Sequence, residues 1–74
     1  MAGFLIEYNR RNGDHRVTKF PGEDGHQEAL RRRLELEAER TDPDWEIASL
    51  NSDSLETVMK THARYFEGRE LIEA

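Results

Sequence analysis

Hydrophobic and polar residues alternate in two short segments near the N-terminus, 4–9 and 15–20. Both segments are rich in β-branched and aromatic residues, which is typical of strands. Asn12-Gly13 lies between them and is a strong hairpin signal, because a type I′ turn needs two residues that tolerate positive φ. We therefore predict an antiparallel hairpin with this two-residue loop, in which Leu5 lies opposite Phe20.

The pattern then changes to a helical period over about 25–40. The hydrophobic stripe of this segment is thin, and most of its other residues are Arg or Glu. Asp42-Pro43 marks its end, because a residue that precedes proline disfavours the α conformation. Trp45-Glu46-Ile47-Ala48-Ser49-Leu50 follows and is predicted to form a third strand over about 45–50.

Residues 54–67 carry the clearest amphipathic pattern of the chain. Their hydrophobic positions recur at intervals of three and four, at Leu55, Val58, Met59, Ala63 and Phe66, with His62 on the same stripe. This spacing places the side chains on one face of a helix. We expect a second helix over about 54–67, with Met59 and Phe66 buried against the sheet.

Together these elements predict a single α+β domain over residues 1–74, with the order β-β-α-β-α. A crossover between parallel strands is right-handed, and the simplest arrangement leaves a gap that the first strand fills. The predicted sheet is therefore three-stranded and antiparallel, with strand order 2-1-3. Both helices are expected on one face, which gives a two-layer sandwich.

The face opposite the helices is then expected to expose an apolar patch. Strand alternation places Leu5, Phe20 and Leu50 there, with Glu7 and Glu46 beside them. Exposed patches of this kind mark interaction sites. The alternative is that the C-terminal Leu71-Ile72 folds back and covers the patch.

Composition limits the classes of function that remain. A chain of 74 residues without cysteine has a small core and neither disulfides nor thiolate–metal sites to stabilise it. Absent disulfides favour a reducing compartment, so we expect a cytoplasmic protein, and no hydrophobic run is long enough to span a membrane. The net charge of −5 argues against non-specific binding of nucleic acid.

No constellation of residues predicts catalysis or a cofactor. None of His15, His26 and His62 has another histidine at helical metal-ligand spacing, and no glycine-rich phosphate loop is present. The serines at 49, 52 and 54 fit the end of a strand and a helix cap. We therefore predict no enzyme activity, no catalytic residue, no metal site and no cofactor.

Two charged regions offer further possibilities. Basic residues on the predicted hairpin form a candidate contact surface for phosphate backbones: Arg10, Arg11, Arg16 and Lys19. Seven acidic residues cluster between 35 and 53 and could attract a basic partner. Solvated, ion-paired surface is the simpler interpretation of both.

The leading hypothesis from sequence is a small non-enzymatic interaction or regulatory module. It is expected to be a homodimer or a subunit, to bind protein through the uncovered sheet face and the acidic half, and not to bind membranes. The alternative is a nucleic-acid-binding module that uses the basic hairpin and the first helix. A small hydrolytic or metal-dependent enzyme is the third possibility.

Overall fold

The computed structural model describes residues 2–71 and contains one sheet, two α-helices and a short 3₁₀-helix. The elements follow one another as β1 (Ala2–Asn9), β2 (His15–Phe20), α1 (Gly25–Glu39), β3 (Trp45–Ser52), α2 (Leu55–Thr61) and η1 (Ala63–Phe66). β1 and β3 are each two residues longer than predicted, at the N-terminus and the C-terminus respectively.

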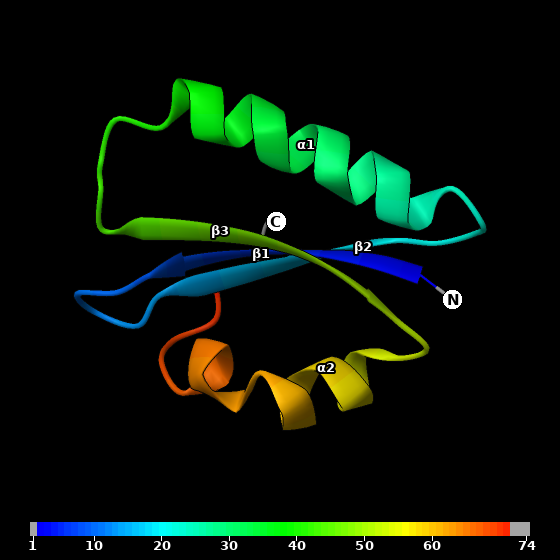
Figure 1. The fold of residues 1–74 in the computed structure, drawn as a ribbon. Coiled ribbons are helices and arrows are strands. Elements are labelled where there is room, and N and C mark those ends of the chain that lie inside the picture. Colours follow the sequence, from blue (N-terminus) through cyan, green and yellow to red (C-terminus); the bar gives the residue numbers. More distant parts are fainter. Residues whose placement is uncertain (1, 72–74) are drawn as a thin grey trace.

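The predicted fold class, element order and sheet topology are confirmed. The sheet has the order β2-β1-β3, and the central strand β1 is antiparallel to both neighbours. β2 and β3 are therefore parallel to each other, and α1 crosses over β1 to connect them. Figure 1 shows this arrangement, with β1 between the other two strands.

The prediction that both helices share one face is wrong. Figure 1 shows α1 on one side of the sheet and α2 on the other, so the molecule has three layers and not two. The register of β3 explains the difference. Phe4 lies opposite Leu50, and Glu7 lies opposite Ile47, so β3 directs Leu50 to the α2 side and Ile47 to the α1 side. The prediction had placed Ile47 on the same face as Phe4, and Leu50 on the opposite face.

The hairpin also differs from its prediction. Ile6 lies opposite Val17 and Leu5 opposite Thr18, a shift of two residues that leaves every side chain on its predicted face. Gly13 alone in the loop has positive φ (82°), so a type I′ turn does not form. Instead Asn9 Oδ1 accepts hydrogen bonds from the backbone N–H groups of Arg11 (2.9 Å) and Asn12 (3.3 Å), which widens the loop.

The main core lies between the sheet and the α2–η1 segment. It contains Phe4, Ile6, Val58 and Tyr65, and Phe66 is partly buried against it. The helix itself is shorter than predicted, since α2 ends at Thr61 and η1 continues the chain.

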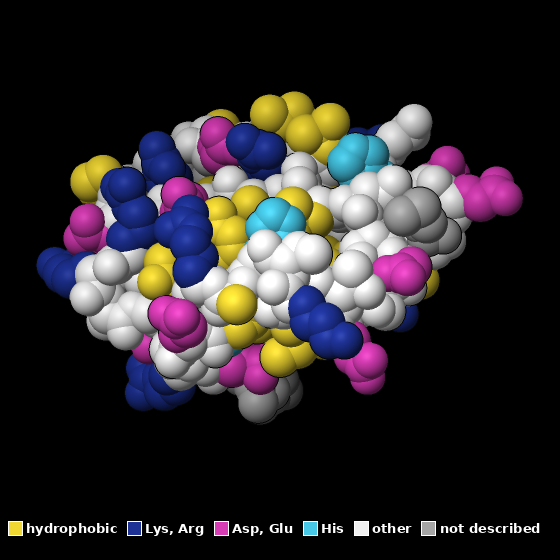
Figure 2. Space-filling model, turned by 60° about the horizontal axis from the view of Figure 1, so that its bottom comes forward, with side chains coloured by type: hydrophobic (Ala, Val, Ile, Leu, Met, Phe, Trp, Pro, Cys, Tyr) yellow, Lys and Arg dark blue, Asp and Glu magenta, His cyan; other side chains and the backbone are white. Residues whose placement is uncertain are grey.

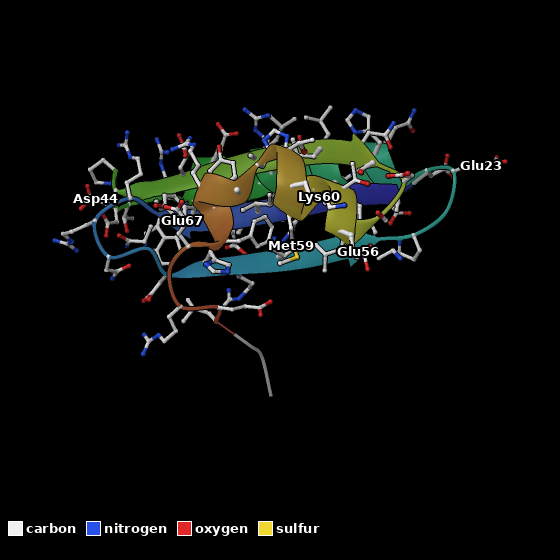
Figure 3. The ribbon with its side chains drawn as sticks, turned by 90° about the horizontal axis from the view of Figure 1, so that it is seen from below. Glu23, Asp44, Glu56, Met59, Lys60 and Glu67 are labelled. Carbon is white, nitrogen blue, oxygen red and sulfur yellow. The ribbon has the colours of Figure 1, made fainter. Side chains whose placement is uncertain are left out.

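The expected burial of Met59 is wrong, because its side chain is 45 % exposed. Figure 3 shows the Met59 side chain directed from α2 over β2.

On the other side, α1 meets the sheet at its N-terminal end. A Cβ atom at Gly3 would overlap the carbonyl group of Gly25, so these two glycines allow the backbones of β1 and α1 to approach closely. Ala29 is fully buried one turn further on. The small residues of α1 therefore hold the start of the helix against the sheet, and only its later part leaves space beneath it.

Candidate interaction surface

The apolar patch predicted on an uncovered sheet face is not formed. Leu5 is only 2 % exposed and lies on the α1 side, where Phe20 also lies. Leu50 points to the other face and packs against the core. Of the two acidic residues predicted beside the patch, Glu7 is on the α1 side and Glu46 on the α2 side.

Leu5, Phe20 and Glu7 do come together, but in a cleft beneath α1. A hollow of about 330 Å³ is lined by these residues with Arg16, Thr18, Arg32 and Leu36. It adjoins a second hollow of about 370 Å³, whose lining includes Trp45, Ile47 and Leu71. Leu71, predicted as a possible cover for the patch, thus lines this cleft; Ile72 lies outside the described residues.

The basic hairpin residues contact acidic groups and carbonyls. Arg11 forms ion pairs with Asp44 (3.5 Å) and Asp42 (4.0 Å), and Arg10 donates to the carbonyl oxygen of Pro43 (2.9 Å). Arg16 pairs with Glu7 at 3.7 Å across the β1–β2 ladder.

Lys19 is exposed on β2, away from the loop arginines. Figure 2 shows Lys and Arg side chains gathered toward one end of the α2 side, with acidic side chains among them. Acidic side chains therefore pair with two of the four basic residues, Arg11 and Arg16, and the hairpin does not form a uniformly positive surface.

Basic side chains also pair with part of the acidic cluster. Arg32 pairs with Glu35 and Arg33 with Glu37 along α1. Arg64 donates to Glu46 (2.8 Å) and to the Tyr65 hydroxyl (3.0 Å), and the hydrogen bond to Tyr65 raises the pKa of the guanidinium above its ordinary value.

A hydrogen bond to Thr57, with a further one to Ser52, lowers the pKa of Asp53. Asp53 therefore stays ionised to lower pH than a free carboxyl.

Two of the three histidines, His15 and His62, pack against aromatic rings, and His26 is exposed on α1. His15 is buried, its ring lies edge-on to Phe66 at 5.4 Å, and its Nδ1 lies 3.2 Å from the Gly13 carbonyl oxygen. His62 stacks on Tyr65. Within residues 2–71, no group of three His, Cys, Asp or Glu side chains is arranged to hold a metal ion. None of the described helices is long and apolar enough to cross a membrane.

The two edges of the sheet differ sharply. At the β2 edge, the backbone N–H of His15 donates to the carbonyl of Arg69 (3.0 Å), and Leu71 donates back to the carbonyl of His15 (2.6 Å). The chain therefore covers the start of this edge with its own C-terminal segment. Lys19 in β2 and Pro21 directly after the strand protect the remaining part of this edge, since both residue types discourage pairing with another strand.

The β3 edge has none of these protections. The strand is eight residues long, contains no Lys or Pro, and pairs with β1 without a bulge. Figure 3, which views the face of the sheet from the α2 side, shows β3 at the margin of the sheet. Among residues 2–71, no strand lies beyond it.

The hydrogen-bonding groups on this edge follow from the ladder. The backbone N–H and C=O of His15 point away from β1, so His15 and its partner Tyr8 are not hydrogen-bonded to each other. The backbone groups of Tyr8 point instead to Glu46 on β3. By alternation, Ile47, Ser49 and Asn51 point their backbone groups away from β1. None of the described residues hydrogen-bonds to these outward groups.

Exposed leucines flank the same edge. Arg32 lines the cleft on the β2 side of α1, and Leu30 and Leu34 each lie two residues from it. Counted from the buried Ala29, Leu30 lies about 100° and Leu34 about 140° around the helix, on the opposite half of α1 from Arg32. Both leucines are therefore on the half of α1 nearer β3, and Leu34 is turned further from the sheet than Leu30. Leu30 is 41 % and Leu34 is 60 % exposed. We define the β3-edge surface as the outward backbone of Ile47, Ser49 and Asn51 with the side chains of Leu30 and Leu34.

The predicted strand order already leaves the third strand, which has no Lys or Pro, open at an edge of the sheet. The exposure of Leu30 and Leu34 beside this edge was not predicted. The side of α1 that meets the sheet could not be identified from the thin hydrophobic pattern of the helix.

Comparison with protein-family models, with curated proteins and with solved structures finds no significant match to this chain. The function is therefore argued from the geometry of the β3-edge surface and its surroundings.

Proposed function

We propose that this protein is a small, non-enzymatic interaction module, either self-associating or a regulatory subunit, that binds by strand addition at β3. The observation that carries the proposal is the β3-edge surface, an eight-residue edge strand without protection and with two exposed leucines beside it. Edge strands with free N–H and C=O groups accept an extended segment of another chain, and adjoining apolar side chains add affinity.

The remaining surfaces favour this assignment over the others. The arginines of the hairpin loop are engaged by Asp42, Asp44 and Pro43, which weakens the case for nucleic-acid binding. The cleft beneath α1 brings the Glu7–Arg16 pair together with apolar walls, but among residues 2–71 neither threonine hydroxyl in its lining is hydrogen-bonded to a base. The absence of cysteine in the chain supports a cytoplasmic location.

A proline at the edge tests the proposal. Ser49→Pro removes one outward N–H, and because that group makes no bond within the sheet, the domain should remain folded. We expect partners captured from native extract by the parent protein to be lost with Ser49→Pro. Lys19→Glu on the opposite edge serves as the matched control and should retain them.

Capture that is indifferent to Ser49→Pro, in a variant whose circular dichroism is unchanged, would contradict strand addition at β3. Salt-sensitive retention of labelled RNA or DNA, lost when Arg10 and Arg11 are replaced by Ser, would instead support the nucleic-acid alternative.

A further inference from the structure

We infer that the partner at the β3 edge is a second copy of this chain, paired through β3 about a two-fold axis at Ser49 to form a continuous six-stranded sheet. This inference rests on the proposed function, because it identifies the strand that the β3-edge surface accepts. A second copy presents the same unprotected eight-residue edge strand, and a two-fold interface brings one surface against itself.

The hydrogen-bonding groups select the register. With the axis at Ser49, each Ser49 lies opposite its equivalent, and Ile47 lies opposite Asn51 of the second copy. Every outward N–H and C=O of these three residues then meets a complementary group. If the axis lay at Ala48 instead, Asn51 would face Trp45, whose N–H already donates to the carbonyl of Asp42 (3.2 Å).

The side chains are compatible with this register. Glu46 would lie opposite Ser52 and Trp45 opposite Asp53, so no two carboxylates of the paired segments face each other directly. This matters because each copy carries a net charge of −5.

The helices add the apolar part of the interface. A two-fold axis perpendicular to the sheet keeps the α1 helices of both copies on the same face. Leu30 and Leu34 lie on the half of α1 nearer β3, with Leu34 further from the sheet, and they would approach their equivalents across the axis above the paired strands. The paired surface consists of one strand and two leucines per copy, which is at the small end of specific interfaces. We therefore expect a dimer that dissociates on dilution.

The chain contains no cysteine, so single introduced cysteines report on the register without background. Opposed residues of a hydrogen-bonded antiparallel pair have Cα atoms about 5.5 Å apart, within the range that a disulfide spans. We expect Ser49→Cys to form a covalent dimer rapidly with oxidised glutathione. Asn51→Cys is the matched control, because its equivalents would be four residues out of register, about 13 Å apart.

Sedimentation of the cysteine-free protein over a concentration series completes the test. We expect a monomer–dimer equilibrium that Leu34→Ala weakens about tenfold or more and that Ser49→Pro abolishes. A protein that stays monomeric at millimolar concentration would overturn the inference. So would a dimer in which Ser49→Cys cross-links no faster than Asn51→Cys.

These outcomes separate the inference from the proposed function. A monomeric protein that still captures another protein through a Ser49→Pro-sensitive contact would refute the homodimer and leave strand addition standing. A monomeric protein whose captured partners ignore Ser49→Pro would refute both.

Discussion

Leu5 and Leu34 are the same residue type in opposite situations. Leu5 is buried between the central strand and α1, whereas Leu34 projects into solvent beside β3 at 60 % exposure. The folded monomer therefore depends on the first, while the second has no packing role within the described chain. An exposed leucine by itself is ordinary, but this one lies beside an unpaired strand edge together with Leu30.

We predict that Leu5→Ala lowers the free energy of unfolding by about 2–5 kcal/mol, because it removes most of a buried side chain and enlarges the cleft beneath α1. Leu34→Ala should change it by less than about 0.5 kcal/mol in the monomer. Denaturant unfolding at a concentration low enough to exclude dimers measures both. Equal losses for the two variants would mean that α1 does not lie as described.

Four glycines, in two close contacts, determine how closely segments of the chain approach. Gly13 has positive φ, as the hairpin signal required, and a Cβ atom at Gly68 would overlap the Gly13 carbonyl group. Gly3 and Gly25 form the corresponding contact under α1. The loop glycine was predictable from the Asn-Gly pair. The two close contacts were not, because they join residues that are distant in sequence.

Among the elements, the strands and the approximate positions of the helices were predictable, since alternation and helical periodicity depend only on local sequence. The change from α-helix to 3₁₀-helix after Thr61 was not. The face of the sheet on which each β3 side chain lies was not predictable. The strand reads Trp-Glu-Ile-Ala-Ser-Leu and has hydrophobic residues at both odd and even positions, because both faces of the sheet are covered. A one-residue ambiguity there moved Leu50 and Ile47 to the wrong sides and created the patch that does not exist.

The second helix is short, so its cap carries a large share of its stability. Ser54 Oγ accepts a hydrogen bond from the backbone N–H of Thr57 (3.2 Å) at the start of the seven-residue α2. We predict that Ser54→Ala destabilises the protein by about 1 kcal/mol, whereas Ser54→Asp, which keeps an acceptor at the cap, is tolerated. Thermal unfolding of the two variants measures the difference, and a larger loss for Ser54→Asp would contradict the capping role.

At the scale of the whole molecule, the chain builds its small core on one side of the sheet and a looser contact on the other. The C-terminal segment that covers the β2 edge has no counterpart among residues 2–71 at the β3 edge. A domain of this size buries only about 60 % of the surface of its unfolded chain, so pairing at β3 would add burial that the monomer lacks. The two edges of the sheet are therefore protected unequally.

Amide hydrogen exchange of the parent protein at two concentrations tests this claim most directly. The outward amides of Ile47, Ser49 and Asn51 should exchange quickly in dilute solution and become protected together as the concentration rises. The amide of Ala48, which bonds to β1, should be protected at both concentrations. Protection of the three outward amides that is the same at both concentrations, or that rises equally at Val17 on the opposite edge, would contradict the account.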